Sequence, residues 1–101
     1  MYEVFGNVAS RAFRVLWALE ELGQEYTLTL ANPQDAVIRA VYPVGKVPAM
    51  RVGTDILTDS TAIITYLADK HGGLSAPAGT IARAHQDAIT HAIIDEIDAV
   101  L

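Results

Sequence analysis

A proline at the entry of a predicted strand, followed by a helix that begins with Asp-Ser, constrains the fold of this chain most. Residues 45–50 read GKVPAM and residues 59–67 read DSTAIITYL. Pro48 has no backbone N–H, and the bond before a proline can be cis. We therefore expect the N–H and C=O of Val47 to face a peptide-like ligand instead of a neighbouring strand. This stretch predicts a docking edge.

Asp59 and Ser60 lie where the next helix is predicted to begin. The first turn of a helix has N–H groups without helical partners and a partial positive charge, which suit a small carboxylate. Taken separately, the proline reads as a strand entry and Asp-Ser as a helix cap. Between the two motifs we expect a strand, a turn at residues 53–55 and a second strand that leads into the capped helix. This order brings the proline and the Asp-Ser pair to one edge of the sheet. Together they indicate a site for a short acidic peptide.

Composition limits the remaining possibilities. The chain has 101 residues, of which 51% are hydrophobic, so the length favours one domain with an ample core. No apolar run approaches the roughly 18 residues that span a bilayer, and the start does not resemble a signal peptide. We expect a soluble, cytoplasmic protein. Because the chain has no cysteine, any thiol chemistry must come from a bound ligand.

The charge pattern argues against nucleic-acid binding. The net charge is −5, with five basic and five acidic residues in residues 1–51, and two basic and seven acidic residues in residues 52–101. An acidic chain without a basic stripe lacks the phosphate contacts that supply most of that affinity. The three histidines have no metal-ligand spacing, so we expect no metal site.

Hydrophobic periodicity predicts alternating strands and helices. The predicted strands are residues 2–5, 26–30, 48–52 and 56–58, and the predicted helices are residues 10–22, 33–40 and 59–71. Ser10 is the expected N-cap of the first helix and Gly23 its stop. The order βαβα followed by ββα favours an α/β (α+β) thioredoxin-like fold with a mixed four-stranded sheet. Trp17 is interpreted as a core or domain-interface residue.

The composition changes after the third predicted helix. Residues 74–79 read as a linker, and a long amphipathic helix is predicted from residue 81 onward. Asp95, Glu96 and Asp98 crowd its predicted C-terminal end, where the helix dipole disfavours anions. We therefore expect Leu101 to be a cut and a second, helical domain to follow.

Three segments resemble, in order, the amino-terminal domain of cytosolic glutathione transferases. Residues 10–23 (SRAFRVLWALEELG) resemble the first helix of that family, residues 42–50 (YPVGKVPAM) its pre-strand loop and residues 59–67 its third helix. Residues 80–101 resemble the first helix of the carboxy-terminal domain. The resemblance implies a thioredoxin-like glutathione-binding domain at residues 1–74, a linker at 75–79, and the first helix of a truncated helical domain at 80–101.

The resemblance also implies a binding site. The Val47 main chain would pair with the cysteinyl part of glutathione beside cis-Pro48. Asp59 and Ser60 would hold the γ-glutamyl end, and Lys46 is the candidate for the glycyl carboxylate. Glutathione would be a co-substrate, and no metal is expected.

The catalytic position is assigned to the start of the first helix. The thiol of glutathione has an ordinary pKa of about 8.5, which must fall by roughly two units for the thiol to be ionised at neutral pH. That shift requires about 2.7 kcal/mol of preferential stabilisation of the thiolate. Family members use a Tyr, Ser or Cys in this region. Ser10 is placed ahead of Asn7, which occupies the position of the activating serine in many members, and Tyr2 is far behind. A plain N-cap is an equally good interpretation of Ser10.

Two arginines accompany this helix start. Arg11 and Arg14 are interpreted first as solvated helix-surface residues, with tuning of a thiolate as the alternative.

These residues and the resemblance together predict a cytoplasmic glutathione transferase that acts in detoxification and conjugates glutathione to an electrophile. The resemblance implies a homodimer, and it implies that the electrophile pocket is lined mostly by carboxy-terminal helices. The alternative is a non-catalytic glutathione-fold binding or interaction module.

Overall fold

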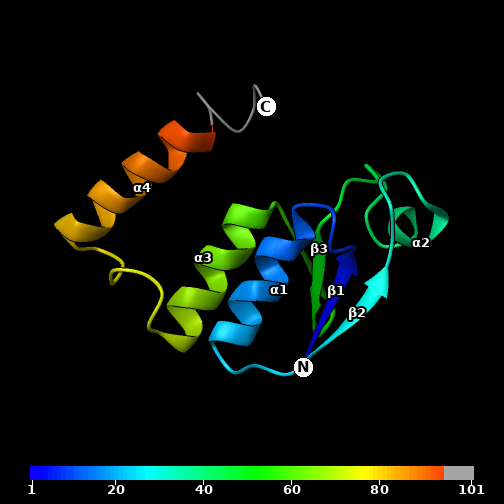
Figure 1. The fold of residues 1–101 in the computed structure, drawn as a ribbon, viewed down its shortest axis with the longest axis horizontal. Coiled ribbons are helices and arrows are strands. Elements are labelled where there is room, and N and C mark those ends of the chain that lie inside the picture. Colours follow the sequence, from blue (N-terminus) through cyan, green and yellow to red (C-terminus); the bar gives the residue numbers. More distant parts are fainter. Residues whose placement is uncertain (95–101) are drawn as a thin grey trace.

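The computed structural model describes residues 1–94, and its element order confirms the predicted pattern (Figure 1). The elements are β1 (Tyr2–Gly6), α1 (Ala12–Glu21), β2 (Tyr26–Leu30), α2 (Ala36–Arg39), β3 (Ala49–Val52), β4 (Asp55–Thr58), α3 (Ser60–His71) and α4 (Ile81–Ile93). The four strands form one sheet in the order β2-β1-β3-β4. β1 is parallel to β2 and antiparallel to β3, which is antiparallel to β4. This is the predicted thioredoxin-like arrangement.

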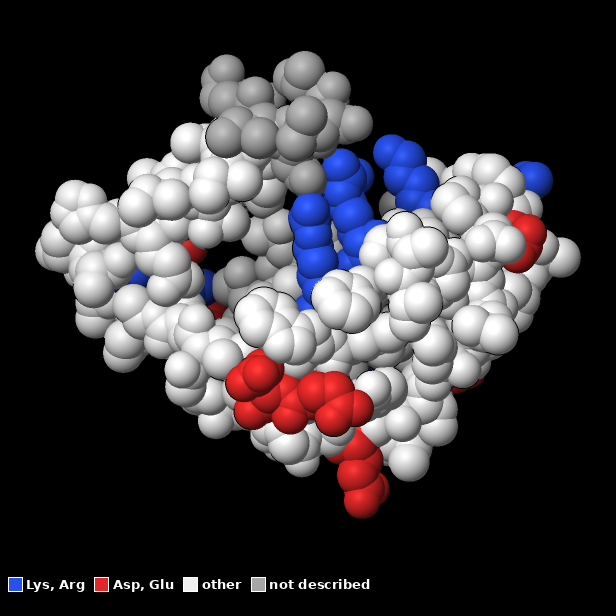
Figure 2. Space-filling model, in the orientation of Figure 1, with Lys and Arg blue, Asp and Glu red and all other residues white. Residues whose placement is uncertain are grey.

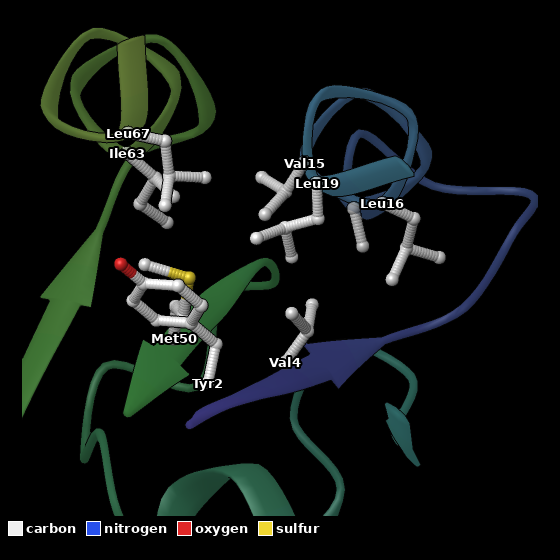
Figure 3. Close-up of a cluster of buried hydrophobic side chains, with 9 residues drawn as sticks. Tyr2, Val4, Val15, Leu16, Leu19, Met50, Ile63 and Leu67 are labelled. Atoms are coloured by element: carbon white, nitrogen blue, oxygen red, sulfur yellow. The ribbon is translucent and has the colours of Figure 1, made fainter. Parts of the chain in front are cut away.

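The main core lies between the sheet and the pair α1 and α3, which lie side by side over one face (Figures 1 and 3). The largest fully buried side chains of this core are Val4, Val15, Leu19, Met50, Ile63 and Leu67, each 0% exposed. Burying one such side chain stabilises a fold by about 1.5–3 kcal/mol. A smaller cluster around Ile38 of α2 includes Phe5 and Ala49. The first cluster fixes α1 and α3 on the sheet, and the second packs α2 against β1 and β3.

The start of α1 differs from the prediction. The helix begins at Ala12 with Arg11 in the N-cap position and no side-chain cap. Ser10 precedes the cap, and its hydroxyl accepts a hydrogen bond from the Ala12 N–H at 3.2 Å. The predicted end is confirmed, since Gly23 adopts a left-handed φ of 66°. The predicted N-cap role of Ser10 is therefore wrong by one residue, because an extra turn precedes the helix.

α2 is also shorter than predicted. Gln34 has a left-handed φ of 71°, which interrupts a helix. Its N–H donates to the carbonyl of Gly45 at 2.8 Å, and the Asn32 N–H donates to the Asp35 carboxylate at 2.8 Å. These contacts hold residues 32–35 in a loop, so the helix begins only at Ala36.

α4 begins as predicted, with the Thr80 hydroxyl accepting from the Arg83 N–H at 3.1 Å. Its predicted apolar stripe is exposed over the described length, including Ile81 at 75% and Ile89 at 61%. The predicted continuation with Asp95, Glu96 and Asp98 lies outside the described residues. Within residues 1–94, no helix is both long and apolar enough to cross a membrane.

The contact between α3 and α4 depends on the buried side chain of Arg83. Its guanidinium donates two hydrogen bonds to the Asp69 carboxylate, at 2.7 and 3.1 Å, and one to Asp87 at 3.0 Å. A further bond reaches the carbonyl of Ala76 at 3.2 Å, in the connecting loop. Hydrogen bonding to Arg83 lowers the pKa of Asp69 below its ordinary value. This ion pair joins α3, the loop and α4.

We expect the ion pair of Asp69 and Arg83 to stabilise the fold near neutral pH and to lose this effect in acid. Because the folded-state pKa of Asp69 is lowered, its contribution is complete above the ordinary value and is lost as the pH falls through the lowered one. Asp69→Asn should therefore lower the thermal midpoint at about pH 6, and the difference from wild type should shrink toward about pH 2. Circular dichroism melts of both proteins across this range measure the difference. A difference that does not change with pH would contradict the assignment.

Candidate functional site

One cavity, of about 280 Å³, opens where the loop before β3 meets the start of α3. The residues that line it are Arg11, Tyr42, Lys46, Val47, Pro48, Thr58, Asp59 and Ser60. All five predicted binding residues are therefore placed in one cavity, although the loop and the start of α3 are separated by both strands of a hairpin. Tyr42 and Thr58 were not predicted as site residues, and each lies in or beside a segment that the sequence singled out.

The backbone of Val47 provides one wall. The peptide bond between Val47 and Pro48 is cis, and strand pairing begins only at Ala49, opposite Phe5. Among the described residues, none takes a hydrogen bond from the Val47 N–H or gives one to its C=O. The edge predicted from the sequence is thus present, with polar backbone groups beside a cavity.

Gln34 holds the loop that carries this edge. Its backbone N–H donates to the Gly45 carbonyl at 2.8 Å, and its side-chain amide donates to the Val44 carbonyl at 3.0 Å. Gly45 has a left-handed φ of 78°, and a Cβ there would lie 2.6 Å from the Gln34 side-chain oxygen. The backbone conformation favours glycine here, and a Cβ would also require the Gln34 side chain to move.

The start of α3 provides the opposite wall. Asp59 has a left-handed φ of 71°, a conformation that costs a non-glycine residue about 1–3 kcal/mol. Its carboxylate accepts from the Ala62 N–H at 3.0 Å, as an N-cap does. Ser60 follows in the first turn and is only 5% exposed, with its accessible part on the cavity. A partial positive charge and a carboxylate therefore lie together, as recognition of an amino acid requires.

The predicted catalytic residues Ser10 and Asn7 lie in the turn before α1 and are not among the residues lining the cavity. The Ser10 hydroxyl donates to the Asn7 carbonyl at 2.8 Å. The Asn7 side-chain amide donates to the Ala31 carbonyl at 3.2 Å and to the Asn32 side chain at 2.8 Å. Arg11, which was interpreted first as a surface residue, is the residue of this segment that reaches the cavity.

Tyr2 belongs to the core and not to the cavity. Its ring is 7% exposed, and its hydroxyl lies 2.6 Å from Nε2 of His71, at the end of α3. Burial, together with Tyr66, raises the pKa of the Tyr2 hydroxyl. These contacts agree with the low rank given to Tyr2 from the sequence.

Larger hollows lie along α3 and α1. One, of about 590 Å³, lies between α3 and α4 around Arg83 and shares Asp59 with the cavity. Another, of about 620 Å³, lies beside α1 against Trp17 and Leu74. Trp17 is 61% exposed, so its interpretation as a core residue is wrong and a domain-interface role stays a prediction. Within residues 1–94, the structure contains no group of three His, Asp or Glu side chains arranged to hold a metal ion.

Comparison with known proteins agrees with this fold. Residues 5–75 match the family described as glutathione S-transferase, N-terminal domain. A probable maleylacetoacetate isomerase of Caenorhabditis elegans is 30% identical over 93 residues, which are 89% of this chain and 44% of that protein. Glutathione S-transferase Z2 of Arabidopsis thaliana is 31% identical over 74 residues, which are 70% of this chain and 33% of that protein.

A solved structure is similar over almost the whole chain. The theta class glutathione S-transferase of Xanthomonas axonopodis pv. citri, determined with glutathione bound, has a TM-score of 0.85 and 28% identity. The match covers 98% of this chain and 51% of the other. The chain therefore has the thioredoxin-like fold of that structure.

The chain belongs to the glutathione S-transferase family, and residues 5–75 correspond to its amino-terminal domain. It spans less than half the length of the two curated relatives.

Asp59 offers a test of the local geometry. Asp59→Ala removes the side-chain acceptor for the Ala62 N–H, and we expect it to destabilise the protein by about 1 kcal/mol. Asp59→Asn keeps an acceptor and tolerates the left-handed backbone, so it should stay within about 0.5 kcal/mol of wild type. Urea denaturation measures both values. Equal losses in the two variants would show that the carboxylate acts by charge and not as a cap.

Proposed function

We propose that this protein binds glutathione in the cavity between Val47 and Ser60 and ionises its thiol for attack on an electrophile. The observation that supports this most strongly is the Val47 backbone, which has no hydrogen-bond partner within residues 1–94 and lies on the same cavity as the start of α3. The cysteinyl part of glutathione pairs with Val47 beside Pro48. Asp59 receives the α-amino group of the γ-glutamyl end, and Ser60 and its helix N-terminus receive the carboxylate.

Lys46 receives the glycyl carboxylate in this proposal. It lines the same cavity, immediately before Val47. A lysine ammonium is a compact cation that suits a single carboxylate. The three parts of glutathione thus have partners of opposite charge or matching hydrogen bonds along one groove.

Thiol ionisation takes place near the start of α1. Ser10, with Asn7 second, remains the proposed activator from the family pattern. This assignment requires the Ser10 hydroxyl to exchange its 2.8 Å bond to the Asn7 carbonyl for one to the sulfur. One relative is named a transferase and the other an isomerase, so their names differ in the reaction. The proposal therefore covers the binding and ionisation of glutathione and does not name the second substrate.

The whole protein is proposed to act as a cytoplasmic homodimer in detoxification. Residues 1–74 form the glutathione-binding domain, residues 75–79 the linker, and residues 80–101 the first helix of a helical domain. The start of α4 at Ile81, after a loop, supports this division. The exposed apolar residues of α4 support a partner, since large exposed apolar patches mark interfaces.

A non-catalytic glutathione-binding module is the alternative. The engaged donors of Ser10 and Asn7 favour it, because neither side chain is arranged to stabilise a thiolate. Conjugation of a generic aryl halide separates the two functions. Glutathione-dependent turnover above the uncatalysed rate supports the enzyme, whereas glutathione binding without turnover supports the module.

Ser60→Ala tests the binding site directly. We expect it to weaken glutathione binding by about 1–3 kcal/mol, because a buried hydroxyl partner of the γ-glutamyl carboxylate is lost. Isothermal titration calorimetry measures the change. Thr54→Ala, in the exposed turn between β3 and β4, is the control and should bind as wild type does. Unchanged affinity in Ser60→Ala would place glutathione elsewhere.

A further inference from the structure

Tyr42 brings to the cavity a hydroxyl group that the proposed function does not use. A tyrosine hydroxyl has one hydrogen to donate, and its oxygen can also accept. The hydroxyl of Tyr2 bonds to His71 at 2.6 Å, and that of Tyr26 donates to Glu20 at 2.7 Å. Within residues 1–94, the hydroxyl of Tyr42 has no hydrogen-bond partner, although Tyr42 lines the cavity. Its hydrogen can therefore be donated to a ligand.

The ring of Tyr42 is held in place by the smaller core cluster. The residue is half-buried, and it packs against Phe5, Ala31, Ile38 and Ala49. Its backbone N–H donates to the Ile38 carbonyl at 2.8 Å, which ties it to α2. A tyrosine with a packed ring and an unbonded hydroxyl is typical of a position between an apolar core and a wet surface. The hydroxyl is thus positioned before a ligand arrives.

A tight turn brings Tyr42 close to Lys46. The Gly45 N–H donates to the Tyr42 carbonyl at 2.8 Å, and the ends of such a four-residue turn lie less than about 7 Å apart. Lys46 follows the turn directly. Gln34 holds the turn from the other side, through its bonds to the carbonyls of Val44 and Gly45. Tyr42 and Lys46 therefore leave neighbouring points of one loop and line the same cavity.

The charges around this pair favour an anion. Lys46 forms no ion pair within residues 1–94. Among the described residues that line the cavity, Asp59 is the acidic one, and it lies on the opposite wall at the start of α3. Figure 2 shows Lys and Arg side chains gathered over the start of α1, which borders the cavity, and acidic side chains over the other end of that helix. A carboxylate near the loop has a cation and a hydroxyl donor together.

We propose that Tyr42 is a specificity-determining residue that binds the glycyl carboxylate of glutathione together with Lys46. The Tyr42 hydroxyl donates to one carboxylate oxygen, and the Lys46 ammonium donates to the other. A hydrogen bond to an ionised acceptor is roughly twice as strong as one between neutral groups. The inference rests on the proposed glutathione site, and it makes the loop before β3 selective for a peptide with a carboxylate one residue beyond the cysteine.

The test compares the binding of two peptides by isothermal titration calorimetry. One is glutathione, and the other is γ-glutamylcysteine methylamide, in which a hydrogen replaces the glycyl carboxylate. Tyr42→Phe keeps the packed ring and removes the hydroxyl. We expect it to weaken glutathione binding about tenfold and methylamide binding less than about twofold, because the methylamide has no carboxylate to lose its donor.

Two matched variants separate this end of the peptide from the rest. Ser60→Ala, at the proposed γ-glutamyl end, should weaken the binding of both peptides by the same factor. Tyr26→Phe removes a hydroxyl that bonds to Glu20 and does not line the cavity, so it should bind both peptides as wild type does.

The outcomes that would overturn the proposal are distinct. Equal losses for both peptides in Tyr42→Phe would show that Tyr42 supports the loop and does not bind the carboxylate. Unchanged glutathione affinity in Tyr42→Phe would overturn the proposal as well. Wild-type protein that binds the methylamide as tightly as glutathione would exclude a carboxylate site at the loop but not the proposed function. Absence of binding of either peptide to wild type would instead overturn the proposed function together with this role.

Discussion

The register of β3 is the constraint on which the rest of the site depends. Ala49 pairs with Phe5 of β1 on one side and with Thr58 of β4 on the other. The strand that leads to α1, the proline before β3 and the strand that leads to α3 therefore all meet at the same end of the sheet. A shift of one residue would turn every side chain of β3 to the opposite face and remove Met50 from the core. The packing of α1 and α3 on the sheet secures this register (Figure 3).

The same end of the sheet collects features that reduce stability. Asp59 keeps a left-handed backbone, and Val47 leaves its polar backbone groups without partners among the described residues. Arg11 lies at the N-terminal end of α1, where the helix dipole by itself disfavours a cation. The Asp59 carboxylate suits an amino group, and the Val47 backbone suits a peptide backbone. Their combination in one cavity is the physical basis of the proposed function.

The sequence predicts the strands and α3 well, because alternation, turns and caps are local signals. It fails where contacts between distant residues decide the outcome. Ser10 caps a turn before α1, and not α1 itself, and Gln34 shortens α2 through its bonds to the loop before β3. Arg83 is a charged residue, a type usually found on the surface, but it is buried in the structure, where it bonds to Asp69 of α3. The five proposed binding residues that line the cavity were predicted from motifs in sequence order, whereas the place of Arg11 on the cavity depends on how the turn is folded.

The central claim is that the loop before β3 and the start of α3 form one site for glutathione. An amide NMR titration of ¹⁵N-labelled protein with glutathione tests it most directly. The account predicts that the largest shifts occur together at Val47 and Ser60, which are thirteen positions apart in the chain, with little change at Thr54 in the hairpin between them. Shifts concentrated around Trp17 and Leu74, or an absence of shifts at millimolar glutathione, would contradict it.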